Sequence, residues 1–310
     1  MSRSWVRILK QSEESGKGEL VRVAIIGGSG KMGRWFAKFL LREGKEVIIT
    51  GRNEKKLLAA RQQLGVEATT DNVAAVKNSD VVLLSVSIDN LEEVIAQVST
   101  YIRPEQVIID ITSIKVLPVE MMHKHIKTGL TLGTHPIFGP GAKSIANQNF
   151  VLTPTNERET TLAQKVREYL ETRGAKVTVM TPREHDEMMA VILGLSHFIA
   201  IVSADTLLSF DRLKQMEAVS GITYKVLLTL VESVLSEDPG LYATLQMSLP
   251  DMTEVEKLFQ QRGQIWADLV KNKDKQEFIK RMKALRSRLE EGNPDFGKAY
   301  ENMYNIAEGL

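Results

Sequence analysis

Between residues 21 and 180, the hydrophobic pattern alternates between short strands and amphipathic helices. The run VRVAIIGG at 21–28 is rich in β-branched residues and ends in glycine, which is typical of a buried parallel strand. The segment KMGRWFAKFLLREG at 31–44 has apolar residues at helical spacing and ends in glycine. Further strand-like runs, separated by helical stretches, are EVIIT, DVVLLSV, QVIIDIT, LTLGTHP, NFVLTP and AKVTVM. This alternation predicts an α/β fold with a mainly parallel, doubly wound sheet.

The pattern changes at Thr181. The residues TPRE provide an N-cap threonine, a proline at the first helical position and Glu184 to close a capping box. The segment HDEMMAVILGLSHFIAIVSADTLL that follows is apolar on almost every side, so we expect this helix to be buried all round. The rest of the chain is helical in pattern. We therefore predict a polar N-terminal extension at 1–20, an α/β domain at 21–182 and an all-helical domain at 183–310. A second subunit supplies part of the cover of the apolar helix, which predicts a homodimer.

Composition excludes several kinds of partner. The hydrophobic content of 43% and charged content of 25% are ordinary for a soluble globular protein. With 40 basic and 39 acidic residues, the charge favours neither nucleic acid nor an anionic membrane as a partner. The absence of cysteine excludes disulfides and thiolate metal sites. The apolar runs look too short to span a bilayer and the N-terminus lacks a signal-like core, so we expect a cytoplasmic protein without a membrane segment.

The segment GGSGKMG has the GxGxxG spacing at Gly28, Gly30 and Gly33. The first glycine is expected to allow the tight turn, the second to let backbone approach a pyrophosphate and the third to let helix pack on strand. Because the motif joins a β-branched run to an amphipathic helix, it predicts a Rossmann dinucleotide-binding domain over residues 21–182. The other cofactor contacts are expected from Ser29, Lys31 and Met32 of the same loop and from Ser85 in DVVLLSV.

The end of the second strand bears on the choice of cofactor. In IITGRNEKK there is no acidic residue before Glu54, and Arg52 is placed to meet a 2′-phosphate. This favours NADP over NAD. In the alternative interpretation Asn53 caps a helix and Arg52 is merely solvated, which leaves NAD as the cofactor.

His135, in GTHPIFGPGAKS, lies where a predicted strand ends, at the sheet edge where doubly wound folds bind ligands. Pro136 restricts its backbone, and the Gly-Pro-Gly turn at 139–141 directs the chain away. A histidine held in this way can accept a hydroxyl proton as hydride leaves the same carbon, because its pKa lies near the working pH. The alternative is a polar residue that only caps the strand.

The other histidines are less specific. His197 lies within an apolar helix, where it is either a core histidine bonded to a backbone carbonyl or a substrate contact. His185, in a first helical turn, is interpreted as structural. His123 and His125 would not share a face of a helix, so no metal site is predicted.

Taken together, these segments resemble the prephenate and arogenate dehydrogenase family, oxidoreductases of tyrosine biosynthesis. The likeness runs from about Val21 into the helical domain through GGSGKMG, DITSIK, GTHPIFGP, EHDEMMAVILGLSHF and EDPGLYATLQMS. It implies a Rossmann domain followed by a helical dimerisation domain. The implied reaction is an oxidative decarboxylation, in which hydride leaves C4 of prephenate for NAD(P) and loss of carbon dioxide gives 4-hydroxyphenylpyruvate. Prephenate and arogenate are not distinguished.

The resemblance also implies roles for individual residues. His135 would accept the proton of the substrate hydroxyl, and Ser113 would orient that histidine or the hydroxyl; Ser113 also has a plainer interpretation as a hydroxyl in a turn at the end of a strand. Lys115 would contribute positive charge nearby, and His197 would contact the substrate from the helical domain.

One segment departs from the family pattern. Where bacterial relatives carry arginines that bind the dicarboxylate substrate, this chain has Lys225 and Ser233. Lysine keeps the charge but lacks the bidentate fork of arginine, so we expect Lys143 or Lys225 to bind the substrate. The alternatives are another NADP-dependent Rossmann oxidoreductase, of deazaflavin or hydroxyacid type, and a non-catalytic NADP-binding redox sensor.

Overall fold

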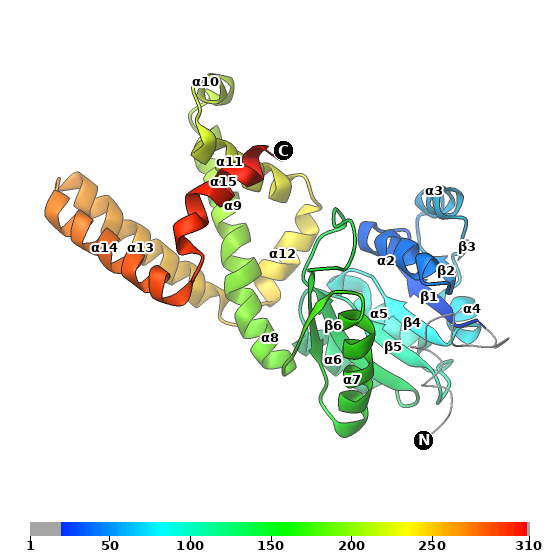
Figure 1. The fold of residues 1–310 in the computed structure, drawn as a ribbon. Coiled ribbons are helices and arrows are strands. Elements are labelled where there is room, and N and C mark those ends of the chain that lie inside the picture. Colours follow the sequence, from blue (N-terminus) through cyan, green and yellow to red (C-terminus); the bar gives the residue numbers. More distant parts are fainter. Residues whose placement is uncertain (1–19, 309–310) are drawn as a thin grey trace. The chain divides into compact units, whose positions relative to one another are not determined.

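The computed structural model describes residues 20–308 and divides into two compact units, one ending at Met188 and the other beginning at Met189 (Figure 1). The predicted extension at 1–20 lies outside the described residues except for Leu20. The division falls after the predicted one at residue 182, so the first turns of the long apolar helix belong with the α/β unit.

The first unit is built on one eight-stranded sheet in the order β3-β2-β1-β4-β5-β6-β7-β8. The strands are β1 (Arg22–Ile26), β2 (Glu46–Thr50), β3 (Glu67–Thr69), β4 (Val81–Leu84), β5 (Val107–Asp110), β6 (Leu130–Pro136), β7 (Asn149–Thr153) and β8 (Lys176–Val179). Neighbouring strands are parallel except for β6 and β7, which are antiparallel. The strand order reverses between β1 and β4, which is where doubly wound sheets bind dinucleotides. The predicted α/β fold is confirmed.

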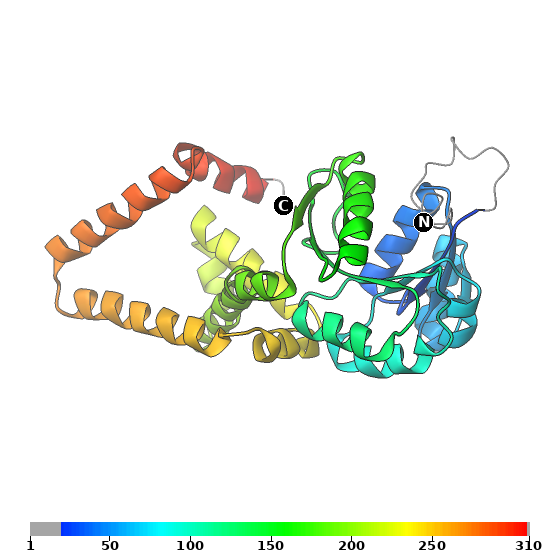
Figure 2. The ribbon, with the colours of Figure 1, turned by 90° about the horizontal axis from the view of Figure 1, so that it is seen from below.

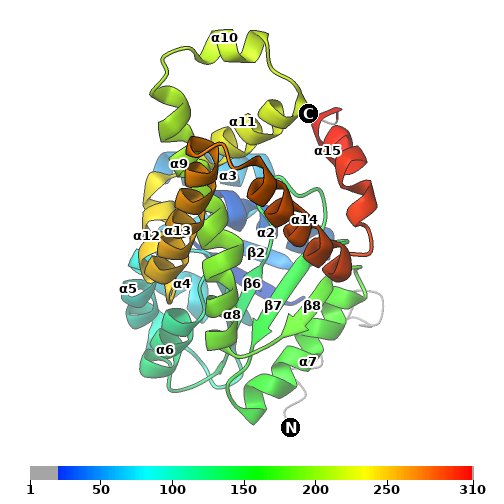
Figure 3. The same cartoon turned by 90° about the vertical axis from the view of Figure 1, so that its left-hand side faces the viewer.

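Helices cover both faces of the sheet. They are α2 (Lys31–Arg42), α3 (Glu54–Leu64) and α7 (Glu157–Glu171) on one face, and α4 (Asn72–Lys77), α5 (Ile88–Ser99) and α6 (Val116–His125) on the other. Because side chains of a strand alternate, Val23 and Ile25 of β1 pack in the first hydrophobic cluster, and Ala24 and Ile26 in the second. Figure 3 shows α5 and α6 on one side of the sheet and α7 on the other.

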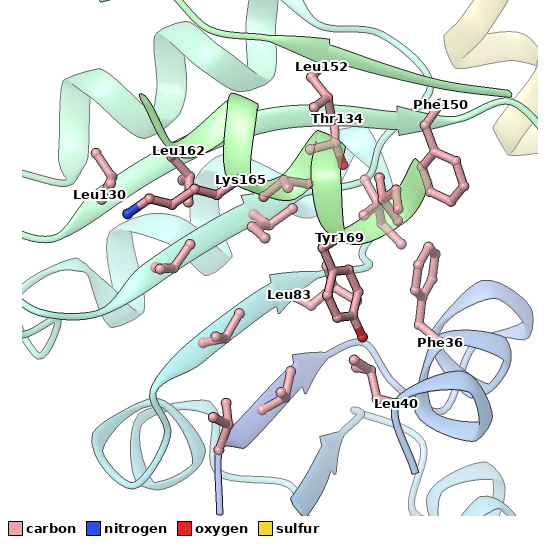
Figure 4. A pocket seen from close by; sticks show the side chains of 18 of the residues that line it. Phe36, Leu40, Leu83, Leu130, Thr134, Phe150, Leu152, Leu162, Lys165 and Tyr169 are labelled. Atoms are coloured by element: carbon pink, nitrogen blue, oxygen red, sulfur yellow. The ribbon is translucent and has the colours of Figure 1, made fainter. Parts of the chain in front are cut away.

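An apolar cavity of about 520 Å³ lies on the first face, between the sheet and the helices α2 and α7. Phe36 and Leu40 of α2, Leu83 of β4, and Leu162 and Tyr169 of α7 are among the side chains that line it (Figure 4). Ligands of doubly wound sheets bind at the carboxyl ends of the strands rather than on a face. The candidate functional site accordingly lies at the carboxyl edge, not in this cavity.

The second unit is helical throughout the described residues. After the shared helix α8 (Pro182–Met189), it contains the π-helical segment η1 (Ala190–Leu195), α9 (Ser196–Leu208), α10 (Leu213–Ala218), α11 (Ile222–Leu235), α12 (Pro239–Ser248), α13 (Met252–Lys271), α14 (Lys275–Gly292), η2 (Phe296–Lys298) and α15 (Ala299–Glu308). α13 and α14 diverge from the turn that joins them (Figure 2). The prediction of an all-helical second domain is confirmed.

α8, η1 and α9 form one continuous helix, Pro182–Leu208, which bears on two expectations, the burial of this segment and its length. Only 17% of its most apolar window is buried, with Val191 and Ile192 each 51% exposed, so a single chain does not bury this helix all round. The mean hydropathy of the window is 1.9. By length and composition alone the helix can cross a membrane, so the expectation that every apolar run is too short was wrong here, although core helices of soluble proteins pass the same test.

Candidate functional site

The glycine loop lies at the carboxyl end of β1, beside the points where β2 and β4 end. Its left-handed residue is Gly27, with φ of 81°, and a Cβ there would lie 2.3 Å from the backbone oxygen of Ser85. Gly28 lies in the same tight turn, with its amide donating to the oxygen of Ile25 at 3.1 Å, but it is not the left-handed residue. Gly28 is required for space instead, because a Cβ at that position would lie 2.6 Å from Cβ of Ile49.

The next two glycines bring α2 close to the loop. A Cβ at Gly33 would lie 2.6 Å from Cα of Gly28, so only glycine lets the helix pack so tightly on the turn. Gly30 is the N-cap of α2, with no side chain to cap the first amides. Lys31 and Met32 form the first turn of this helix. Uncapped amides at a helix N-terminus beside a glycine turn suit a pyrophosphate.

Arg52 and Ser29 lie at the same edge of the sheet. A Cβ at Gly51 would lie 2.3 Å from Oγ of Ser29, so the end of β2 touches the glycine loop. The exposed Arg52 donates from Nη1 to Oδ1 of Asn90, at 3.0 Å, across the start of α5. Asn53 caps α3 by accepting from the amide of Lys56 at 3.0 Å. Asn53 therefore caps the helix, as in the alternative interpretation. The guanidinium of Arg52 still lies at the edge of the sheet that carries the glycine loop.

His135 lies on β6, opposite Val151 of the antiparallel β7, and is 5% exposed. β6 is three strands from β1 in the sheet, about 14 Å at the usual strand spacing. Burial lowers the pKa of His135 well below the ordinary value of 6.5, and the neighbouring His185 and Lys115 lower it further. The ring is therefore neutral at neutral pH, with a lone pair available on one nitrogen.

Two buried residues of α8 extend inward from His135. Nδ1 of His135 lies 2.8 Å from Nε2 of His185, and Nδ1 of His185 lies 2.7 Å from Oδ1 of Asp186. Asp186 also accepts the backbone amides of Lys115 at 2.7 Å and Val116 at 2.9 Å. From the sequence, His185 was interpreted as structural, and its neighbour Asp186 was given no role. The sequence feature that could have indicated these two residues is the adjacent His-Asp pair directly after the capping box of Thr181 and Glu184.

Lys115 is placed differently from the expectation. Its side chain is fully buried, where Nζ forms an ion pair with Asp110 and donates to the backbone oxygen of Thr134 at 2.7 Å. An ammonium enclosed in this way does not contact a substrate as a substrate-binding lysine would, but its positive charge does act on the nearby His135. Through these contacts Lys115 links Asp110, at the end of β5, to Thr134 of β6, the residue directly before His135.

The remaining residues predicted in the first unit are spread along its edge. Ser113 lies in the loop between β5 and α6, half-buried, and its hydroxyl makes no hydrogen bond within the described residues. Lys143 is exposed in the loop after β6 and lines an open cleft of about 1010 Å³ together with basic residues of α2, among them Arg34 and Lys38. The structure does not bring Lys143 into contact with His135.

In the helical unit, the ring of His197 packs edge-on against Tyr242 of α12, with ring centroids 4.7 Å apart. Its Nδ1 is buried without a hydrogen-bond partner among the described residues, and burial lowers the pKa of His197. Gln246, one turn along α12, donates to the oxygen of Gly194 at 2.9 Å, while its Oε1 is also buried and unpaired. A core histidine with Nδ1 bonded to a carbonyl is therefore not what the structure shows. Lys225 lies exposed on α11.

Two family models match the chain. One describes the nucleotide-binding domain of prephenate dehydrogenase and matches residues 36–179, and the other describes its dimerization domain and matches residues 181–284. A probable arogenate/prephenate dehydrogenase of Methanocaldococcus jannaschii is 37% identical over 265 residues, which are 84% of this chain and 59% of that protein. The T-protein of Enterobacter agglomerans is 31% identical over 306 residues, covering 95% and 75%.

Solved structures share the fold. Prephenate dehydrogenase of Aquifex aeolicus, in complex with hydroxyphenyl propionate and NAD+, superposes with a TM-score of 0.74 at 22% identity, over 90% of this chain and 100% of that chain. Arogenate dehydrogenase of Synechocystis gives 0.67 at 19% identity, over 88% and 100%. The two matched domains and the similarity to the T-protein along 95% of the sequence lead to one conclusion: the chain belongs to the prephenate dehydrogenase family.

Proposed function

We propose that the protein is an NAD(P)-dependent dehydrogenase that oxidises and decarboxylates prephenate or arogenate. The observation that carries this proposal is a buried, neutral His135 at the same sheet edge as the glycine loop. Nε2 of His135 has no hydrogen-bond partner among the described residues. This nitrogen is therefore open to a substrate hydroxyl.

The reaction needs a base for one proton. A nicotinamide dinucleotide held by the glycine loop and the first turn of α2 would supply the acceptor for the hydride that leaves C4 of the substrate ring. As C4 becomes a carbonyl carbon, the hydroxyl proton moves to Nε2 of His135. The bond to the ring carboxylate then breaks, and its electron pair moves through the ring to leave a phenolate. The proton returns from His135 to that oxygen, so the protein ends unchanged.

The glycine loop and α2 fit the dinucleotide. Gly27 and Gly28 leave no room for a side chain, and the first amides of α2 are uncapped by any side chain. NADP is the favoured cofactor, because the exposed Arg52 lies at the end of β2, where no acidic residue occurs before Glu54. We also propose that the helical unit forms a homodimer, since a single chain leaves the helix Pro182–Leu208 mostly uncovered.

The test is an absorbance assay of NADP and NAD reduction with prephenate and then with arogenate. His135→Asn should lower kcat by about 10²- to 10⁴-fold, the usual contribution of a general base, and leave cofactor affinity unchanged. His123→Asn, on the outer side of α6, is the matched control and should retain activity. Cofactor binding without turnover of either substrate would contradict the proposal and favour a redox sensor.

Cofactor choice has a separate test. Arg52→Ala should raise the Michaelis constant for NADP by about tenfold, as expected for loss of one charge-assisted contact, and leave that for NAD unchanged. Arg61→Ala, on the exposed side of α3, is the control. A wild-type preference for NAD would show the NADP proposal to be wrong.

A further inference from the structure

We propose that His185 and Asp186 are positioning residues that fix the proton of the His135 ring on Nδ1, so that Nε2 always faces the substrate as the acceptor. The inference rests on the proposed function of His135 as the base. Asp186, His185 and His135 form one buried chain, with exposures of 2%, 0% and 5%. Each link is a hydrogen bond, so the protonation of one member constrains the next.

The constraint begins at Asp186. Both of its oxygens accept backbone amides, Oδ1 from Lys115 and Oδ2 from Val116. A backbone amide can only donate, and an ionised carboxylate can only accept. The third contact of this carboxylate, from Nδ1 of His185, must therefore be a donated N–H.

The two rings follow from this assignment. In this proposal the ring of His185 is neutral. With its proton on Nδ1, this ring presents a lone pair on Nε2, so Nε2 of His185 is an acceptor. The contact at 2.8 Å then requires Nδ1 of His135 to be the donor. In the neutral ring of His135 the only remaining lone pair is on Nε2, the nitrogen without a partner in the described protein. The other tautomer would place two lone pairs against each other between the rings.

The chain also balances charge during the proposed reaction. When Nε2 of His135 takes the hydroxyl proton, the ring becomes a cation whose Nδ1–H still donates to His185. Asp186 lies one ring further on and supplies the compensating negative charge. The other charged group that acts on His135 is Lys115, whose positive charge lowers the pKa of the ring and which is itself ion-paired with Asp110.

Local sequence holds the chain in place from two sides. Thr181 and Glu184 form a reciprocal capping box, with the amide of Thr181 donating to Glu184 at 2.8 Å and the amide of Glu184 donating to Thr181 at 3.2 Å. This fixes where α8 begins, and therefore where His185 and Asp186 point. At the other side, α6 has no capping side chain of its own, and Asp186 serves its first amides.

The experiment compares two replacements of His185. His185→Leu removes the acceptor for Nδ1 of His135, and kcat should fall by about 10²- to 10³-fold with little change in KM. In His185→Gln the amide oxygen can accept from His135 and the amide nitrogen can donate to Asp186. This variant should keep kcat within about tenfold of wild type, because it preserves both hydrogen bonds. Equal losses in the two variants, or full activity of the leucine variant, would overturn the proposal.

A second measurement needs no substrate. Nitrogen-15 NMR of histidine-labelled protein distinguishes protonated from unprotonated ring nitrogens. For His135 we expect a protonated Nδ1 and an unprotonated Nε2 at neutral pH, and His135→Asn assigns the signals. A proton on Nε2 overturns the inference even if the enzyme turns over prephenate. Failure to turn over either substrate, with the expected tautomer, instead counts against the proposed function.

Discussion

The α/β unit and the helical unit differ in whether their buried polar groups have hydrogen-bond partners. Around His135 the buried side chains of Asp110, Lys115, His185 and Asp186 all have partners within the unit. In the helical unit, Nδ1 of His197 and Oε1 of Gln246 have none among the described residues. A buried polar atom without a partner is unfavourable by about 1–3 kcal/mol. The buried side chains around His135 therefore have their hydrogen-bond partners within the first unit. The second unit has two buried polar atoms that need a ligand or a solvent molecule as partner.

The two units also differ in how far their apolar side chains are buried within one chain. Ile25 and Leu84, in the centre of the sheet, are fully buried. The helix Pro182–Leu208 instead leaves Val191 and Ile192 about half exposed, although it is long and apolar enough to cross a membrane. Contiguous exposed apolar surface of this kind marks an interaction site. A single subunit can form the whole sheet core, but it cannot cover this helix.

The largest expected effect tests the buried ion pair of the first unit, between Lys115 and Asp110. Lys115→Met leaves the fully buried Asp110 without its cation, so the free energy of unfolding should fall by about 3–5 kcal/mol. Urea unfolding measures it, with the exposed Lys143→Met as the control, expected within about 0.5 kcal/mol of wild type. Adding Asp110→Leu to Lys115→Met should recover much of the loss. A loss below about 1 kcal/mol for Lys115→Met would show that the ion pair does not stabilise the end of β6.

The sequence predicts those parts of the molecule that depend on neighbouring residues. The β-branched runs and helical spacings identify the sheet and its order of elements, because burial on one face repeats every two or every 3.6 residues. The capping box at Thr181 and Glu184 forms as predicted, since all its atoms lie within one turn. The left-handed residue of the turn is Gly27, which precedes the GxGxxG spacing and was not singled out, because consecutive glycines make the motif ambiguous.

The candidate site is less predictable, because its contacts join distant segments. His135 and His185 are 50 positions apart in sequence, and only the folded sheet brings α8 beneath the end of β6. The burial of Lys115 is equally invisible locally, since a lysine after a strand is usually solvated. The apolar helix is largely uncovered in one chain, and the second chain that we propose as its cover is not displayed by one sequence.

The next largest effect tests the exposed helix as the dimer interface. Ile192→Glu and Val202→Glu each place a charge on its exposed apolar surface. If the homodimer buries this surface, each should weaken association by about 2 kcal/mol or more, roughly a 30-fold rise in the dissociation constant. Sedimentation velocity over a concentration series measures it, with Lys55→Glu on the exposed side of α3 as the control. Unchanged association in both variants would remove this helix from the interface.

A smaller effect is expected from pH. Because the pKa of His135 is below 6.5 in the folded protein, the unfolded chain binds more protons between that pKa and 6.5. The free energy of unfolding should therefore fall as pH drops below 6.5, by about 1.4 kcal/mol for each unit by which the folded pKa is lowered. The groups that face the ring are His185 and Lys115, with their partners Asp186 and Asp110.

The measurement is urea unfolding at a series of pH values, for wild type and for His135→Gln. The difference between the two proteins isolates His135, because His197, whose pKa burial also lowers, is present in both. Wild type should lose more stability than the variant as the solution is acidified. Parallel pH profiles would mean that the buried ring of His135 is not kept neutral by its surroundings.

The smallest effect is expected where the helical unit is incomplete. Gln246→Met removes the hydrogen bond to Gly194, which contributes about 1 kcal/mol, but it also removes the buried, unpaired Oε1. The two changes oppose each other, so the free energy of unfolding should stay within about 1 kcal/mol of wild type. Thermal unfolding of the ligand-free protein measures this change. A loss of about 3 kcal/mol would show that Oε1 already has a hydrogen-bond partner, so the two units would not differ in their buried polar groups. A near-neutral result with a raised KM would place the substrate beside Gln246 and His197.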